Sequence, residues 1–269
     1  MTLNEAASIL KEAGIDSPLY EARQIFSEVG NIPIERLIFG AEADDDSAVC
    51  AAVKKRAERI PLEYVIGHTY FYREKYTVTP DCLIPRGDTE RLVDYAVAHI
   101  PKGELFVDLC TGSGCVALSV LNNTEKTEAL AVDISDAALA VARKNANDLG
   151  LSDRAGLISA DALGDAVCQR CYAVLSNPPY VTEDEYPTLS EEIHKEPRIA
   201  FVGGRDGLDF YRKITQTYRS VIADDGFIAF EIGYRQAAAL CDIAKSNSMS
   251  CEILTDLAGN DRVAVLRKI

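Results

Sequence analysis

The sequence predicts an α/β protein with a doubly wound, mostly parallel sheet of seven strands, a small helical domain before the sheet, and a β-hairpin between the two. Three observations predict this fold. From residue 105 onwards, apolar strand patterns alternate with helical patterns, which is typical of a sheet with helices on both faces. The first 60 residues carry helical periodicity alone, and residues 61–85 are rich in aromatic and β-branched side chains. A chain of 269 residues can bury a core of this extent without disulfides or metals.

Residues 1–60 are expected to form a helical domain that recognises the substrate. Ser17 and Pro18 indicate a helix start, because a capping hydroxyl precedes a proline suited to the first turn. Apolar residues recur at helical spacing and no strand pattern interrupts them. The two stripes are Leu3, Ala6, Ala7 and Leu10, and Leu19, Ala22, Ile25, Phe26 and Val29.

Residues 61–85 are predicted to form a β-hairpin linker, and residues 86–269 the domain that contains the sheet. Strand-like runs in the linker are Tyr64–Gly67, Tyr70–Tyr72 and Tyr76–Val78. The predicted strands of the sheet are Leu105–Leu109, Glu128–Val132, Gly156–Ser159, Tyr172–Ser176, Phe227–Ile232, Cys251–Thr255 and Arg262–Arg267, with helices near 114–121, 135–148, 207–223 and 234–246. A short loop at Gly259 and Asn260 joins the last two strands, which should therefore pair antiparallel.

Composition narrows the range of partners. The chain has 42 acidic and 28 basic residues, a net charge of −14 and a pI of about 4.7. Nucleic acid is bound chiefly through Lys and Arg at its phosphates, so we expect no direct nucleic-acid binding and favour a protein partner or small substrate. There is no apolar run of membrane-spanning length and no signal peptide at the start, so we expect a cytoplasmic protein without membrane contact, by default a monomer.

Eight scattered cysteines are typical of free thiols in a reducing compartment. Cys168 and Cys171 have the spacing of a ligand pair, but zinc needs four ligands and the three histidines are far away in the sequence. We therefore expect no metal.

A nucleotide-binding loop is predicted where the first strand of the sheet ends. Asp108, Leu109, Cys110, Thr111, Gly112, Ser113 and Gly114 lead directly into a helix, and glycines there allow a tight turn and close approach of a ligand. Asp133 closes the next strand about 20 residues later, where a carboxylate can accept ribose hydroxyls. Asp161, after the third strand, can contact an adenine amino group or cap a helix. An NAD site, a plain strand-to-helix turn and a simple N-cap at Asp133–Ser135 remain open on these residues alone.

The motif Asn177-Pro178-Pro179-Tyr180 follows an apolar strand and so should lie beside this loop. An amide nitrogen is a poor nucleophile, and it must be oriented to attack a methyl donor. The side-chain oxygen of Asn177 and the carbonyl of Pro178 can each accept one N–H of an NH₂ group, and the prolines restrict the loop. Tyr180 offers a flat face for a planar amide or base. A general base is not needed, because the methylated product is strongly acidic. The alternative is a Pro-Pro turn after a buried strand.

These motifs, in this order and spacing, resemble the HemK-type glutamine methyltransferases that modify the Gly-Gly-Gln loop of class-1 release factors, the proteins that end translation. The likeness also includes Leu83-Ile84-Pro85-Arg86-Gly87-Asp88-Thr89-Glu90 and Glu231-Ile232-Gly233. It is strong over residues 60–269, whereas the N-terminal segment is similar in character only. The Asn-Pro-Pro-Tyr motif is shared with DNA and RNA amino-methyltransferases, and the Leu-Ile-Pro-Arg stretch is more specific.

The resemblance implies a Rossmann-like class I methyltransferase that uses S-adenosylmethionine to methylate a glutamine amide. It implies that Asp108 to Gly112 and Asp133 hold the cofactor, that Asn177 touches both cofactor and acceptor, and that Pro178, Pro179 and Tyr180 shape the glutamine pocket. Gly114 and Asp161 complete the expected cofactor site. The sequence departs from the family pattern at Gly87, where proline is common, and at Ala162, where some members have a tryptophan against the adenine.

The closest alternative is a DNA or RNA exocyclic-amino methyltransferase, which would use the same pocket for a flipped base. Such enzymes usually carry a basic recognition region, and the sequence shows none. A dehydrogenase would leave Asn177–Tyr180 without a role, and a catalytically inert adaptor would not need a complete pocket. Arg86 and Glu90 are expected either to form an ion pair that organises the hairpin or to contact substrate, and Glu231 to support the pocket.

Overall fold

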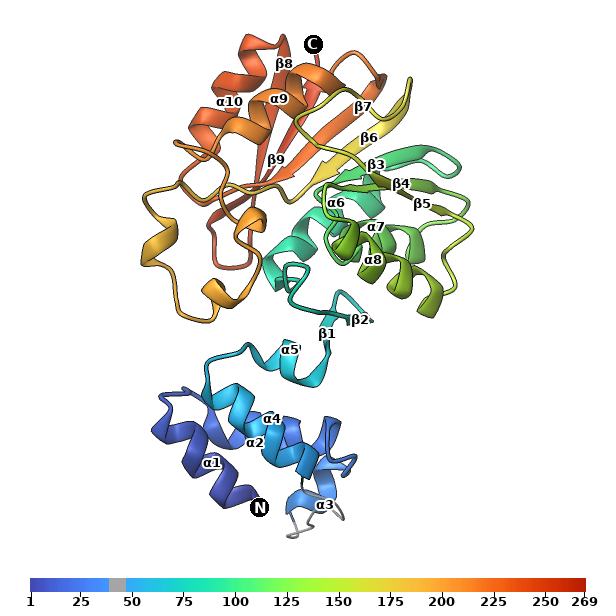
Figure 1. Cartoon of the computed structure of the whole chain (residues 1–269). Coiled ribbons are helices and arrows are strands. Elements are labelled where there is room, and N and C mark those ends of the chain that lie inside the picture. Colours follow the sequence, from blue (N-terminus) through green and yellow to red (C-terminus); the bar gives the residue numbers. More distant parts are fainter. Residues whose placement is uncertain (39–46) are drawn as a thin grey trace. The chain divides into compact units, whose positions relative to one another are not determined.

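The computed structural model describes residues 1–38 and 47–269, and these fold as two compact units (Figure 1). The first unit, here the helical unit, comprises residues 1–68 and 190–195, and the second, the sheet unit, comprises residues 69–189 and 196–269. Over these described ranges, the helices are too short or too polar to cross a bilayer.

The described residues of the helical unit form five α-helices, and amphipathic spacing explains their core. Thr2 begins the first helix with a capping box, in which its hydroxyl accepts from Glu5 N and the Glu5 carboxylate accepts from Thr2 N. Buried Leu10, Ile25 and Phe26 lie in one apolar cluster, which joins the two predicted stripes. Leu19 was placed in the second stripe but is 40% exposed. The helices are α1 (Leu3–Glu12), α2 (Pro18–Glu28), α3 (Ile34–Ile38), α4 (Ser47–Ala57) and α5 (Leu62–Ile66).

The strand expected at Tyr64–Gly67 is wrong, because residues 62–66 form the helix α5. Gly67 ends this helix in the left-handed conformation, with φ +81°, and its N–H donates to Glu63 O at 2.8 Å. A proline before the helix and a glycine after it therefore override the strand preference of the residues between them. The hairpin that follows consists of β1 (His68–Phe71) and β2 (Glu74–Thr77).

The sheet unit contains a seven-stranded sheet in the order β5-β4-β3-β6-β7-β9-β8. The strands are β3 (Leu105–Leu109), β4 (Glu128–Asp133), β5 (Ala155–Ser159), β6 (Cys171–Ser176), β7 (Ile222–Glu231), β8 (Met249–Thr255) and β9 (Asp261–Lys268). Strand β9 pairs antiparallel with both β7 and β8, and the other pairs are parallel. The predicted doubly wound sheet and its antiparallel last pair are thus confirmed.

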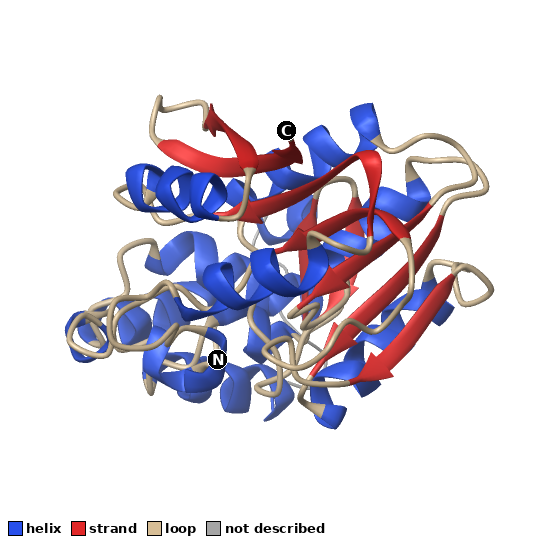
Figure 2. Ribbon diagram, turned by 90° about the horizontal axis from the view of Figure 1, so that it is seen from above, coloured by secondary structure: helices blue, strands red, loops and turns tan. Residues whose placement is uncertain are grey.

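Helices cover both faces of this sheet (Figure 2). Successive side chains of β3 point to opposite faces, so Phe106 belongs to one apolar cluster and Val107 to the other. The helices are α6 (Glu90–His99), α7 (Cys115–Asn122), α8 (Asp136–Asp148), α9 (Asp209–Tyr218) and α10 (Ala237–Ser246). Helix α6 was not predicted, although its buried Leu92, Val93 and Ala96 have helical spacing.

The expectation of free cysteines is wrong for one pair. Cys241 of α10 and Cys251 of β8 form a disulfide, because helix and strand are consecutive and their Cα atoms lie 5.2 Å apart. The other six cysteines are free thiols.

Candidate active site

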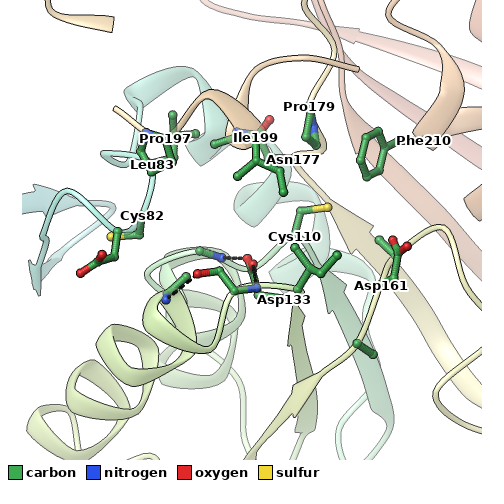
Figure 3. Close-up of a pocket in the computed structure, with 18 of the residues that line it drawn as sticks. Cys82, Leu83, Cys110, Asp133, Asp161, Asn177, Pro179, Pro197, Ile199 and Phe210 are labelled. Atoms are coloured by element: carbon green, nitrogen blue, oxygen red, sulfur yellow. Dashed lines mark hydrogen bonds between the residues drawn. The ribbon is translucent and has the colours of Figure 1, made fainter. Parts of the chain in front are cut away.

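A cavity of about 220 Å³, here the large cavity, lies in the sheet unit at the carboxyl ends of β3, β4 and β6. In the strand order, β3 lies between β4, which follows it in the sequence, and β6, which is reached by a crossover. Ligands of doubly wound sheets bind at such switch points. Figure 3 shows Cys110, Asp133 and Asp161 on one side of this cavity, with Leu83, Asn177 and Ile199 across from them.

The Asp108 side chain stabilises the loop after β3 through hydrogen bonds. Its carboxylate is buried and accepts from the Thr111 hydroxyl at 2.5 Å and from Ala117 N at 3.2 Å. Burial raises the pKa of Asp108 to about 7. Gly114 begins α7 at φ +82°, where a Cβ would lie 3.1 Å from Leu118 and 3.2 Å from Ala142. Asp108 and Gly114 thus stabilise the loop and its packing and do not line the large cavity.

Asp133 lies at the end of β4 and lines the cavity. Its two carboxylate oxygens accept from Gly112 N at 2.8 Å and from Ser135 N at 2.9 Å (Figure 3). Ser135 in turn caps α8 by accepting from Ala138 N. The Asp133 carboxylate therefore connects the glycine loop to the start of α8, and each oxygen keeps acceptor capacity for a ligand hydroxyl.

Other walls of the cavity come from residues beyond β3, β4 and β6. Asp161, a predicted site residue, accepts from Leu163 N at 2.8 Å and lines the cavity beside Ala162. Phe210 of α9 adds an aromatic ring on this side (Figure 3). The remaining apolar walls include Cys82, Leu83, Pro197 and Ile199. Ile199 lies in a single 3₁₀ turn and the others in loops, so no periodic sequence pattern marks them, and only the Leu-Ile-Pro-Arg stretch includes one of them, Leu83.

Asn177 lies where three cavities adjoin, since it lines the large one and two smaller ones. It follows Ser176, the last residue of β6, whose hydroxyl donates to Leu109 O at 2.7 Å and ties the two strand ends together. Its side-chain Nδ2 donates to the hydroxyl of Thr89 at 3.2 Å. The side chain is half-buried, whereas Pro178 and Pro179 are buried.

A smaller cavity, of about 60 Å³, adjoins Asn177 and is lined by Arg86, Tyr180 and Glu231 among others. Glu231 is 2% exposed and accepts hydrogen bonds from the hydroxyls of Tyr180, at 3.3 Å, and Thr89. Burial raises the pKa of Glu231 to about 7, and burial followed by the charge of Glu231 raises the pKa of Tyr180.

The backbone of the motif is held by three residues that the sequence analysis missed. Gln236 Nε2 donates to Tyr180 O at 3.1 Å. A Cβ at Gly203 would lie 2.3 Å from Pro179 O, and one at Gly207 would lie 2.2 Å from Tyr180 O. Glycine at both positions lets the chain pass directly against the motif. Because these contacts are long-range, a single sequence carries no local signal for them.

Arg86 and Glu90 do not pair with each other. Arg86 forms an ion pair with the buried carboxylate of Glu196, which also accepts from Ile84 N at 3.0 Å. Glu90 instead accepts from Tyr72 N at 2.7 Å, in the hairpin. The predicted ion pair is therefore wrong, although each side chain organises its surroundings.

The structure brings most of the predicted site residues together. Those on the large cavity are Cys110, Gly112, Asp133, Asp161, Asn177 and Pro179; Asp108 and Thr111 line a small adjoining cavity, and Tyr180 lines the one beside Glu231. Leu109, Gly114 and Pro178 line none of these cavities and support the walls from behind.

Comparison with known proteins places this geometry in a family. The model of the PrmC N-terminal domain matches residues 2–67, and that of the Methyltransferase small domain matches residues 90–204. A release factor glutamine methyltransferase of Moorella thermoacetica is 35% identical over 270 residues, which cover 97% of this chain and 95% of the relative. One of Cereibacter sphaeroides is 34% identical, over 98% of this chain and 96% of the relative.

The chain belongs to the family of release factor glutamine methyltransferases. A solved structure with the same fold is the ribosomal protein L11 methylase from Lactobacillus delbrueckii subsp. bulgaricus, with a TM-score of 0.51, 21% identity, and coverage of 68% of this chain and 81% of that one. Membership of a release factor glutamine methyltransferase family confirms the resemblance seen in the sequence and makes this chain a methyltransferase.

Proposed function

We propose that this protein transfers a methyl group from S-adenosylmethionine to the side-chain amide nitrogen of the glutamine in the Gly-Gly-Gln motif of class-1 release factors. The observation that carries this proposal is the place of Asn177, which lines both the large cavity that contains Asp133 and the small cavity that contains Tyr180 and Glu231. The full-length similarity to release factor glutamine methyltransferases supports the choice of acceptor.

The large cavity fits the cofactor by its chemistry. Asp133 can accept the ribose hydroxyls, and Asp161 can accept from the adenine amino group. Apolar atoms of Ala162 and Phe210 provide faces for the adenine ring. The ring of Phe210 offers an aromatic surface that the small side chain of Ala162 lacks. When bound, S-adenosylmethionine supplies an electrophilic methyl group on a sulfonium.

In this proposal, the protein acts by orienting the acceptor. Asn177 Oδ1 accepts one N–H of the glutamine amide, so that its nitrogen lone pair faces the methyl group. The second acceptor expected from the sequence, Pro178 O, does not line the cavities described above. Tyr180 packs against the plane of the amide. The nitrogen gains the methyl as the methyl–sulfur bond breaks and its electron pair leaves with the neutral thioether, and the cationic N-methylated amide then loses a proton to solvent. Effective molarities of ~10⁵ M or more are possible from orientation alone.

The test is incubation of the full-length protein with S-adenosylmethionine labelled in its methyl group, with purified release factor in one reaction and tRNA or DNA in another. We expect label in the release factor. Label in nucleic acid alone would overturn the proposal and favour an exocyclic-amino methyltransferase, which the net charge of −14 disfavours.

A further inference from the structure

Three side chains from distant parts of the sheet unit form a hydrogen-bonded chain that ends at Asn177. Thr89, at the start of α6, donates its hydroxyl proton to Glu231 at the end of β7. The same hydroxyl oxygen accepts from Asn177 Nδ2 at 3.2 Å. Thr89 and Glu231 are each 2% exposed, so water does not compete for these bonds.

The direction of each bond in this chain follows from the carboxylate. An ionised carboxylate only accepts, so the single proton of the Thr89 hydroxyl must point to Glu231. The hydroxyl can then only accept from Asn177, which turns the NH₂ end of that amide toward Thr89. The Oδ1 end is left to face the cavities, and the hydrogen bonds of the described residues give it no protein donor.

Burial raises the pKa of Glu231 to about 7, so the carboxylate is ionised above that pH, and there the direction of these bonds is fixed. Arg262 of β9 lies close to this carboxylate and favours its charge, while Asp88, which pairs with Arg262 at 3.1 Å, opposes it. Tyr180 donates to the second carboxylate oxygen. Arg86 also lines the small cavity beside Glu231, although it forms its ion pair with Glu196.

We propose that Thr89 and Glu231 are positioning residues that set which end of the Asn177 amide faces the acceptor. This inference rests on the proposed function, because an acceptor NH₂ group needs the oxygen of Asn177 and is repelled by its nitrogen. Without the chain, the Asn177 amide is free to rotate by half a turn and present an N–H to another N–H. The two residues act through Asn177 and do not touch the reacting atoms.

The kinetic test compares Thr89→Val with Thr89→Ser, which keeps the hydroxyl. Thr89→Val should lower kcat for a Gly-Gly-Gln peptide by about 10–100-fold, because Asn177 loses a hydrogen bond and can turn an N–H toward the N–H of the acceptor. The cofactor dissociation constant should change less than about twofold. Thr89→Ser should restore kcat to within about threefold. Thr127→Val is the matched control, because Thr127 is fully buried just before β4 and its hydroxyl donates to the neighbouring Glu125 O at 3.5 Å.

A double-mutant cycle separates positioning from a structural effect. If Thr89 acts through Asn177, Thr89→Val added to Asn177→Ala should lower kcat by less than about threefold further. A loss of the same 10–100-fold in both backgrounds would overturn the proposal, as would a kcat unchanged in Thr89→Val alone. If Thr89→Val does not fold, the isosteric Glu231→Gln takes its place. Its amide removes the fixed direction, and the same non-additivity with Asn177→Ala is expected.

A second measurement needs no acceptor and therefore distinguishes failure of this inference from failure of the proposed function. The side-chain NH₂ signal of Asn177 in a ¹⁵N spectrum is identified as the one lost in Asn177→Ala. The chemical shift of this signal should change in Thr89→Val and stay unchanged in Thr127→Val. An unmoved signal would overturn the positioning role. A wild-type protein that transfers no methyl to the release factor would overturn the proposed function. The chemical shift would still test whether Thr89 is hydrogen-bonded to Asn177.

Discussion

At the scale of single residues, Asn177 is the side chain on which methyl transfer should depend most. We expect Asn177→Ala to lower kcat at least ~10²-fold and to change the cofactor dissociation constant less, because the lost oxygen orients the acceptor. Steady-state kinetics and calorimetric titration measure the two effects. The exposed Asn147→Ala on α8 serves as control, and near-normal turnover of Asn177→Ala would refute the assignment.

Phe210 should contribute to cofactor binding. Its ring lines the large cavity beside Asp161 and Ala162, so Phe210→Ala is expected to weaken binding of S-adenosylmethionine about 5–30-fold through the loss of ring contact. At saturating cofactor, kcat should change less than about threefold. Tyr234→Ala removes an exposed ring that lies outside this cavity and should leave binding unchanged. Equal affinities for Phe210→Ala and wild type would place the adenine elsewhere.

The buried carboxylate of Glu231 predicts a dependence of stability on pH. Its pKa rises from an ordinary 4.5 to about 7 in the folded protein, so the folded state holds this proton at pH values where the unfolded chain has lost it. The resulting stabilisation is complete below the unfolded pKa and is lost as pH rises through the folded pKa. Asp108 has a raised pKa too, but it titrates in wild type and variant alike.

Glu231→Gln removes this titration. From pH 5 to pH 8 its free energy of unfolding should therefore improve relative to wild type by about 1–2 kcal/mol. Chemical denaturation of both proteins across that range measures the difference. A difference that stays constant with pH would contradict the assignment of a raised pKa to Glu231.

At the scale of elements, the loop that contains Gly203 packs against the backbone of the Asn177–Tyr180 motif. A Cβ at this position would lie 2.3 Å from Pro179 O and 2.9 Å from Tyr180 Cα, so Gly203→Ala must displace the motif backbone. A displacement near 1 Å can cost ~10²-fold in rate, and we expect a loss of that order in kcat. Gly87→Ala is the control, because a Cβ there meets no atom within 4 Å. Normal kcat in Gly203→Ala would show that the motif tolerates movement.

Most elements of the sheet unit could be predicted because their signals are local. Continuous apolar runs such as Cys171–Ser176, buried at every position, read as central strands without knowledge of the fold. Residues 62–66 could not be read in this way, since Tyr64, Val65 and Ile66 prefer strands, whereas the flanking Pro61 and Gly67 favour a short helix.

In the candidate site, too, residues with a local sequence signal could be predicted, and residues placed by long-range contacts could not. Gly112, Asp133 and Asn177 lie at or just after the ends of strands, so their meeting at the carboxyl ends of the sheet could be expected. Thr89 and Glu231 lie 142 positions apart in the sequence, and their hydrogen bond depends on the pairing of whole elements. Such long-range contacts become visible only in the folded chain.

At the scale of the whole molecule, we infer that residues 1–60 bind the protein substrate. In the helical unit, Leu19 and Tyr20 of α2 are 40% and 60% exposed. Replacing both by serine should raise KM for the intact release factor at least ~5-fold and leave KM for a short Gly-Gly-Gln peptide unchanged, because a peptide cannot reach a second surface. Tyr70→Ser removes an exposed ring of the sheet unit and is the matched control. Equal effects on factor and peptide would refute a docking role.

The most direct measurement is fragmentation mass spectrometry of the release factor after reaction with the full-length protein and S-adenosylmethionine. The account predicts the mass of one added methyl, located on the glutamine of the Gly-Gly-Gln motif and absent with Asn177→Ala. A methyl group on any other residue, or an unmodified glutamine after complete incubation, would contradict it.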